Sequence, residues 1–305
     1  MVRDAYFPSC GIGRIHTCRW EPEGQIRGIV QIVHGIAEYA ERYDVVARYL
    51  NSLGYLVVAE DHMGHGKSVN DGGIKGYFHG GWLSVAEDTY QLLKDTRKEF
   101  PDVPYFLFGH SMGSFIVRTI LIDHPEANIA GCIICGTGWI PSAVLKSGLL
   151  ACKTFCSLRG DTVCSKTLQS LVFAGYNNKV EHPRTGYDWL SRDDSVVDAY
   201  LADPLCGFVV TAGLLRDMLT GIGYIQNGKN LLQMNKELPV YFIAGGDDPV
   251  GQYGNGVLQA KAEFEKSGMT KVDCKIYPLC RHEIHNEINK EEVFEDLGSW
   301  LDSHS

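Results

Sequence analysis

Apolar runs alternate with polar stretches in the first and last parts of the chain. The run RGIVQIVHG (27–35) is apolar at nearly every position, as in a strand buried on both faces of a sheet. Similar runs predict strands at 55–61, 104–111, 129–136, 239–248 and 272–279. Apolar residues three and four positions apart predict helices between these strands. This alternation indicates a mostly parallel sheet with helices on both faces.

The predicted helices each have an apolar face. The first apolar face consists of Tyr43, Val46, Leu50 and Leu53. The second consists of Leu83, Ala86, Tyr90 and Leu93, and the third of Met112, Phe115, Ile116 and Ile120. Two further helices are predicted, at 256–267 and at the end of the chain through Leu301. Residues 139–238 follow another pattern, with helical and irregular apolar-rich stretches and no convincing buried strand. We therefore expect an α/β core from 1–138 and 239–305 that is interrupted by a helical cap at 139–238.

Composition narrows the classes of function. The chain has 305 residues and a formal net charge of -9, so it lacks the basic character of a nucleic-acid-binding protein. The first residues, MVRDAYFPSC, contain no apolar segment of signal-peptide length, so we expect a cytoplasmic protein whose ten cysteines are thiols. Cys132 and Cys135 form a C-x-x-C pair, but a strand directs residues three apart to opposite faces. They are interpreted as buried strand cysteines.

The stretch RHEIHNE (281–287) has the composition of a metal site but not its spacing. A zinc-protease helix places its two histidines four residues apart, in the pattern H-E-x-x-H. Here His285 follows His282 after only three residues, and no nearby residue has the spacing of a third ligand. The sequence therefore predicts no metal at this motif, which leaves His282 free to act on protons.

The motif GHSMG (109–113) lies where an apolar strand runs directly into an amphipathic helix. This is the setting of a nucleophile elbow, in which the serine stands exposed on a sharp turn. Gly109 and Gly113 fit because the turn leaves no room for side chains beside it. Ser111 is the predicted nucleophile.

A serine nucleophile needs a base and an acid that orients the base. In an α/β-hydrolase they follow in the order serine, acid, histidine. Asp248 and His282 each come directly after a predicted strand, and we expect them to complete a triad with Ser111. Asp247 is the alternative acid. The alternative base is His285, which is expected to be a surface or capping residue.

The reaction also needs hydrogen-bond donors for an oxyanion. The residue after the nucleophile, Met112, offers one backbone N–H group. The second is expected from Ile36, in the turn formed by His34 and Gly35 after the first predicted strand. No cofactor is required for this chemistry.

Six motifs together resemble the monoacylglycerol lipase and lysophospholipase branch of the α/β-hydrolases, which is grouped with the serine aminopeptidase-like hydrolases. In chain order they are HGIAEYAERY (34–43), DHMGHGKS (61–68), GHSMG (109–113), DPLC (203–206), GGDDPV (245–250) and RHEIHNE (281–287). The resemblance implies the same triad and oxyanion donors, and a cap or lid over an acyl pocket at 139–238. One position departs from the family pattern, because Tyr39 stands where the family usually has histidine.

The expected reaction is hydrolysis of a carboxylic ester, with a monoacylglycerol or lysophospholipid as substrate. The apolar stretch from Trp139 to Phe155 suits an acyl chain, and we also expect transient contact of the cap with a membrane surface. The rival activities are an aminopeptidase or amidase, a short-chain carboxylesterase and a non-catalytic binder of the same fold. An aminopeptidase needs carboxylates in the cap, for which Glu181, Asp188, Asp193 and Asp194 are candidates. Nothing in the sequence assigns an oligomeric state.

Overall fold

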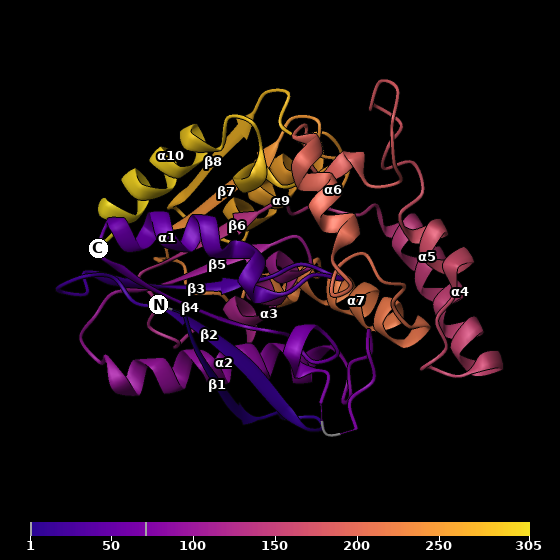
Figure 1. Ribbon diagram of the computed structural model, residues 1–305, viewed down its shortest axis with the longest axis horizontal. Coiled ribbons are helices and arrows are strands. Elements are labelled where there is room, and N and C mark those ends of the chain that lie inside the picture. The colour runs from indigo at the N-terminus through magenta and orange to yellow at the C-terminus, as the bar shows by residue number, and fades with distance from the viewer. Residues whose placement is uncertain (1, 71) are drawn as a thin grey trace.

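The computed structural model describes residues 2–70 and 72–305, and it has one eight-stranded sheet at its centre (Figure 1). The strand order is β1-β2-β4-β3-β5-β6-β7-β8. The pairs β1–β2 and β2–β4 are antiparallel, and all the other pairs are parallel. The strands are β1 (Val2–Pro8), β2 (Arg14–Trp20), β3 (Gly28–Val33), β4 (Tyr55–Glu60), β5 (Tyr105–His110), β6 (Gly131–Cys135), β7 (Val240–Gly245) and β8 (Val272–Tyr277). This arrangement confirms the predicted fold class.

All six predicted strands are present, whereas the sequence analysis assigned no element to β1 and β2. The strands β3 to β7 are buried at every residue, which explains their uninterrupted apolar runs. In β2, by contrast, buried residues such as Ile15 and Trp20 are interleaved with polar and partly exposed ones. Strands of an antiparallel pair at a sheet edge bury less surface, and their sequence signal is correspondingly weak.

Helices cover both faces of the sheet (Figure 1). Successive strand residues point to opposite faces, so Ile32 packs into one apolar cluster and Val33 into the other. The first cluster contains residues of α1 (Asp44–Ser52) and α10 (Lys290–Asp302), and the second contains residues of α2 (Trp82–Glu99), α3 (Met112–Asp123) and α9 (Asn255–Lys266). Leu83 is 54% exposed, so its predicted place on the buried face of α2 was wrong. The buried stripe begins one residue earlier, at Trp82, and continues through Val85, Ala86, Thr89 and Leu93.

The two strand cysteines are placed as predicted. Cys132 and Cys135 are both buried free thiols, and they belong to the clusters on opposite faces of the sheet. A disulfide between them is therefore excluded by the geometry of β6 itself.

The segment 139–238 lies between β6 and β7. Its helices are α4 (Ser142–Arg159), α5 (Lys166–Val172), α6 (Asp194–Ala202), α7 (Ala212–Ile225) and α8 (Gly228–Leu231), with the 3-10 helix η3 (Asp188–Leu190). The segment contains no sheet strand, and its one β-bridge joins Cys164 and Thr211. Three other 3-10 helices lie in loops of the remaining chain, η1 (Ala40–Tyr43), η2 (Gly66–Ser68) and η4 (Ile284–Asn286). Among the described residues, no helix combines the length and the hydropathy that a membrane crossing requires.

Candidate active site

Ser111 lies on a strained turn at the carboxyl edge of the sheet. It follows β5 directly and precedes α3, with φ 54° and ψ -120°, a conformation that non-glycine residues rarely adopt. A Cβ atom at Gly113 would lie 1.9 Å from the carbonyl oxygen of Val33, and one at Gly109 would lie 2.6 Å from that of Gly113. Steric exclusion therefore demands glycine at both positions, as the motif predicted.

Asp248 and His282 are brought together from two neighbouring strand ends. The His282 Nδ1 atom lies 3.0 Å from Asp248 Oδ2, and both side chains are buried. Burial by itself lowers the pKa of an imidazole, but the charge and hydrogen bond of Asp248 outweigh it and raise the pKa of His282. Asp248 Oδ1 also accepts a hydrogen bond of 2.9 Å from the Val250 N–H group. Such a carboxylate can orient an imidazole and stabilise its protonated form.

The turn after β3 packs directly against Ser111. A Cβ atom at Gly35 would lie 3.1 Å from the Ser111 Cβ atom and 2.5 Å from Glu38 Oε1. The side chain of His34 is buried and fixes this turn, with Nδ1 2.7 Å from the Gly35 carbonyl and Nε2 accepting from the His62 N–H group at 2.9 Å. Ile36 is the next residue, and it lines the space around Ser111.

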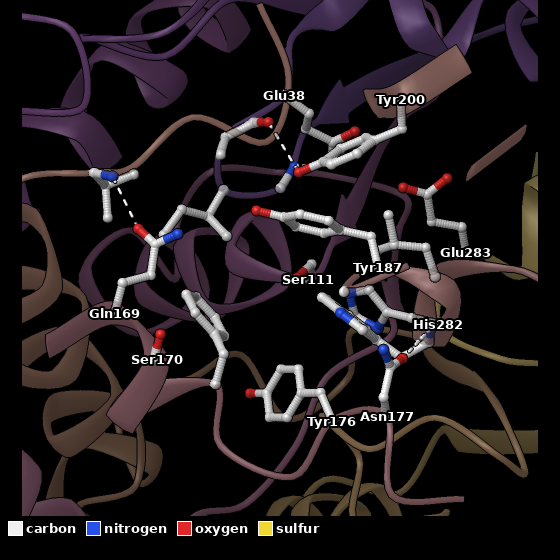
Figure 2. A pocket seen from close by; sticks show the side chains of 18 of the residues that line it. Glu38, Ser111, Gln169, Ser170, Tyr176, Asn177, Tyr187, Tyr200, His282 and Glu283 are labelled. Atoms are coloured by element: carbon white, nitrogen blue, oxygen red, sulfur yellow. Dashed lines mark hydrogen bonds between the residues drawn. The ribbon is translucent and has the colours of Figure 1, made fainter. Parts of the chain in front are cut away.

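Two cavities meet at Ser111, and they differ in polarity. The smaller one, about 460 Å³, is also lined by His282 and by polar side chains of the segment 139–238, namely Gln169, Ser170, Tyr176, Asn177 and Tyr187 (Figure 2). The larger one, about 780 Å³, is lined mostly by apolar side chains, including Phe115, Leu145, Met218, Leu219 and Ile222. The residues that line both cavities are Ile36, Ser111, Phe173, Ala174, Tyr176 and Trp189. Ser111 thus lies where a mostly apolar space adjoins one whose walls combine polar and apolar side chains.

His285 is buried, so the prediction of a surface or capping residue was wrong. It is 2% exposed, and its ring stacks on Tyr43 with ring centroids 4.9 Å apart. Burial and the neighbouring His110 lower its pKa to about 3, so the ring is neutral. The 3-10 helix η4 turns the chain back into the core just after His282, and periodicity alone did not reveal this turn.

A buried ion-pair network that sequence reasoning missed joins the Gly35 turn to the His282 loop. Arg42 donates two hydrogen bonds of 2.9 Å to the carboxylate of Glu283, and it also pairs with Glu38. Glu38 Oε1 accepts from the Gly35 N–H group at 2.6 Å. Burial alone would raise the pKa of Glu38, but Arg42 and His110 hold it well below its usual range. The only sign of this network in the sequence was that Glu38 lies in the motif HGIAEYAERY and Glu283 in the motif RHEIHNE.

The segment 139–238 contacts both loops through main-chain hydrogen bonds. The His282 and Glu283 N–H groups donate to the carbonyls of Trp189 and Leu190, at 3.3 and 2.7 Å. The Tyr200 hydroxyl and the Gly207 N–H group donate to the Ala37 carbonyl, at 3.2 and 2.9 Å.

Tyr39, the position that departs from the family pattern, extends these contacts. Its hydroxyl donates to Asp203 Oδ2 at 2.8 Å. Tyr39 thus links the turn after β3 to the DPLC motif.

None of the four carboxylates of 139–238 that were considered for amine recognition lines either cavity. Asp188 accepts hydrogen bonds from the N–H and hydroxyl of Thr185, and Asp193 caps α6 by accepting from the Ser195 N–H group. Asp194 pairs with Arg184, and Glu181 is exposed. The acidic residues that do line the smaller cavity are Glu38 and Glu283, both already paired with Arg42.

Comparisons with known proteins identify a matching family and several relatives. Residues 24–289 match the family described as serine aminopeptidase, S33. A monoacylglycerol lipase of Mycolicibacterium smegmatis is 29% identical, with 98% of this chain and 96% of that protein covered, and the human monoglyceride lipase is 26% identical, with 95% and 87% covered. A carboxyl esterase from Bacillus coagulans, solved in complex with glycerol, is 32% identical, with a TM-score of 0.92 and coverage of 99% and 98%.

Proposed function

The chain belongs to the serine aminopeptidase S33 family, and from that premise we propose that this ester hydrolase cleaves monoacylglycerols with Ser111, His282 and Asp248 as its triad. The observation that carries the proposal is the meeting at Ser111 of two cavities, one lined by several polar side chains and one lined mostly by apolar side chains. Relatives named monoglyceride or monoacylglycerol lipase support the same substrate class. In this proposal the segment 139–238 is the cap of an α/β core.

The proposed mechanism has two acyl-transfer steps. His282 takes the proton of Ser111 as its Oγ atom attacks the ester carbonyl, and Asp248 stabilises the resulting imidazolium. The N–H groups of Ile36 and Met112 stabilise the oxyanion. His282 then donates the proton to the leaving alcohol, and water repeats the sequence on the acyl-enzyme.

The larger cavity is proposed to hold the acyl chain. Its walls are built from α3, α4 and α7, whose side chains at this surface are mostly apolar. Burial of methylene groups stabilises the bound chain by about 0.8 kcal/mol for each group. No charged residue among 2–70 and 72–305 lines this cavity, so a fatty acyl chain meets no charge from these residues there.

The smaller cavity is proposed to hold the alcohol part of the substrate. Gln169 Oε1 accepts from the Val210 N–H group, which leaves its amide NH₂ group on the cavity side (Figure 2). In the part of the chain that the structure describes, no lysine or arginine lines this cavity, while the carboxylates of Glu38 and Glu283 do. A phosphate group would therefore lack a cationic partner and face like charges, whereas glycerol hydroxyls can bond to the amides and hydroxyls present. This favours a monoacylglycerol over a lysophospholipid.

The outer surface of α4 supports the proposed transient membrane contact. Val144, Leu150 and Leu158 are 59%, 65% and 76% exposed. The helix contains three exposed basic residues, Lys146, Lys153 and Arg159, and no acidic residue, although the whole chain carries a net charge of -9. Apolar and basic side chains on one helix are the combination that binds anionic lipid surfaces. The helix also lines the larger cavity, so such contact would bring the acyl pocket to the lipid.

The test measures fatty acid release from a monoacylglycerol and from a lysophospholipid of equal chain length, with Ser111→Ala as the blank. We expect faster release from the monoacylglycerol and a loss of about 10⁴-fold or more in the variant. Thermal unfolding of both proteins controls for folding. Equal rates on the two lipids would contradict the assignment of the smaller cavity, and release that survives Ser111→Ala would contradict the triad.

A further inference from the structure

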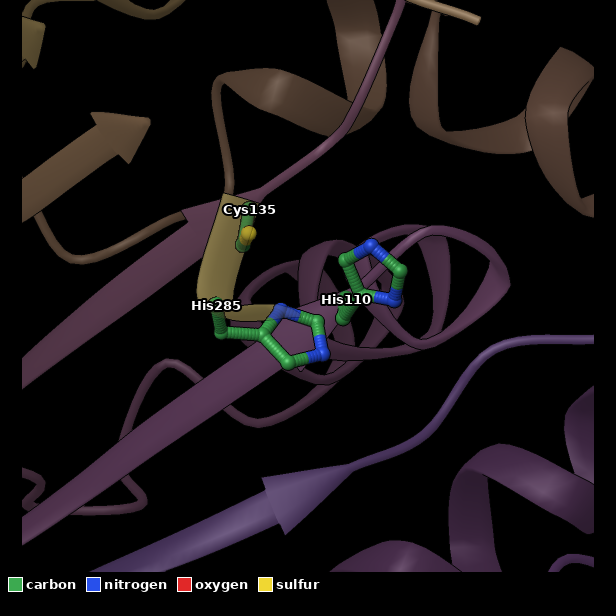
Figure 3. Close-up of side chains that lie close together, drawn as sticks. All are labelled: His110, Cys135 and His285. Atoms are coloured by element: carbon green, nitrogen blue, oxygen red, sulfur yellow. The ribbon is translucent and has the colours of Figure 1, made fainter. Parts of the chain in front are cut away.

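Two histidines and one cysteine from distant parts of the sequence converge behind the active site (Figure 3). His110 ends β5, Cys135 ends β6, and His285 lies in η4. One ligand atom from each residue lies within 4.8 Å of the others, and all three side chains are buried. The spacing rule that excluded a zinc helix in RHEIHNE does not apply to this group, because its members come from three separate elements.

The Nδ1 atom of His285 is buried and has no hydrogen-bond partner among the described residues. Stacking on Tyr43, rather than hydrogen bonding at this atom, holds the ring in place. A buried polar atom without a partner is unfavourable and calls for an explanation, such as an ion that it binds.

Negative charge borders this group, because Glu38 Oε1 lies 3.6 Å from the Nδ1 atom of His110. Glu38 and Glu283 share the single positive charge of Arg42, which leaves this pair one negative charge in excess. A divalent ion bound to a thiolate carries one positive charge and would balance that excess.

We propose that His110, Cys135 and His285 form a binding site for Zn²⁺, and that occupation of the site lowers the hydrolase activity. One thiolate and two neutral imidazoles are characteristic zinc ligands, and a water molecule would supply the fourth. Zn–N bonds of about 2.0–2.1 Å and a Zn–S bond of about 2.3 Å require the three ligand atoms to move closer together. His110 lines the smaller cavity, which gives the ion a route from solvent. On binding, the S–H bond of Cys135 breaks, the S–Zn bond forms and one proton is released to solvent.

The loss of activity follows from the other contacts of His110. Its Nε2 atom lies 3.3 Å from the His282 carbonyl oxygen, and its Nδ1 atom lies 3.0 Å from the Tyr43 hydroxyl. A metal bond to either nitrogen removes one of these contacts. The rings of His110 and His282 are only 4.7 Å apart between centroids, so a shift of His110 displaces the proposed base.

The experiment compares the full-length protein with Cys135→Ser and Cys132→Ser. Cys132 is a matched control, because it is a buried thiol in the same strand but on the opposite face of the sheet. Calorimetry with Zn²⁺ in buffers of different ionisation heat gives the number of ions bound and protons released. Cd²⁺ or Co²⁺ then reports thiolate ligation through a charge-transfer absorption band. For the wild type and Cys132→Ser, we expect one bound Zn²⁺ ion and one released proton. For Cys135→Ser, we expect the charge-transfer band to disappear and the affinity for Zn²⁺ to fall at least tenfold.

Further variants separate this site from other zinc sites. Ser111→Ala should retain the band and the affinity, because the site does not include the nucleophile. If Cys135→Ser fails to fold, His285→Gln takes its place, with the same expected loss. A band that persists in the folded Cys135→Ser or His285→Gln variant would overturn the site. Inhibition by Zn²⁺ of equal strength in wild type and Cys135→Ser would overturn the effect on activity, because the ion would then act elsewhere.

Discussion

Helices α3 and α4 both line the larger cavity, but they differ in how much of each helix is buried. Eleven of the twelve residues of α3 are buried, whereas only two of the eighteen residues of α4 are. The start of α3 is fixed by contacts that admit no side chain, such as the 1.9 Å approach of a Gly113 Cβ atom to Val33. The outer face of α4 is free of such constraints. If the proposed function holds, this contrast predicts that changes at the strand ends affect the chemical step and that changes in the helical segment affect the choice of substrate.

The largest expected effect in the rigid region is the replacement of Asp248. Asp248→Asn should lower kcat by about 10⁴-fold, because the amide no longer holds His282 in the reactive orientation. Asp247→Asn is the matched control, and it should keep most of the activity. The measurement is kcat on one monoacylglycerol for both variants. A larger loss in Asp247→Asn would assign the acid to the neighbouring residue.

The next effect concerns the stability of the same region. Arg42→Met leaves the buried carboxylates of Glu38 and Glu283 without their cation, which should lower the free energy of unfolding by about 3–5 kcal/mol. Arg48→Met removes an exposed pair with Asp44 and should change the free energy of unfolding far less. Urea denaturation of both variants measures the difference. Similar values for the two would show that the buried network does not hold the site together.

A change in the helical segment should alter selectivity rather than chemistry. Ile222→Trp fills part of the larger cavity and should lower kcat/KM for a long acyl chain by about 10- to 100-fold, with a much smaller change for a short one. Leu258→Trp, at an exposed position of α9, serves as the control. The measurement is the ratio of rates across a series of chain lengths. An unchanged ratio would place the acyl chain outside this cavity.

The smallest effect is a displacement of the pH profile. His282 must be unprotonated to accept the Ser111 proton, so kcat/KM should rise with pH through its pKa. Asp248 raises that pKa against the opposing effect of burial. In Asp248→Asn, burial remains and the residual activity should therefore rise at lower pH than in the wild type. A shift toward alkaline pH would show that Asp248 does not control this group.

The sequence predicted the parts of the molecule in which the way residues pack produces a recognisable local pattern of residue types. Strands buried on both faces appear as apolar runs, and the glycines beside Ser111 are the sterically required residues of a sharp turn. The antiparallel strands β1 and β2 were missed because partly exposed edge strands carry a weaker pattern. Leu83 was misplaced because a shift of one position in helical register changes the buried face.

By itself, the sequence determined the α/β class, the serine elbow and the chain order of the acid and the histidine, because each is a local pattern. Only the tertiary structure decided that His282 meets Asp248 at 3.0 Å while His285 enters the core beside His110 and Cys135. It also decided which residues of 139–238 line the two cavities at Ser111. The physical reason is that cavities and buried networks bring together residues that are far apart in the chain. The sequence separation of such residues does not predict that they are in contact.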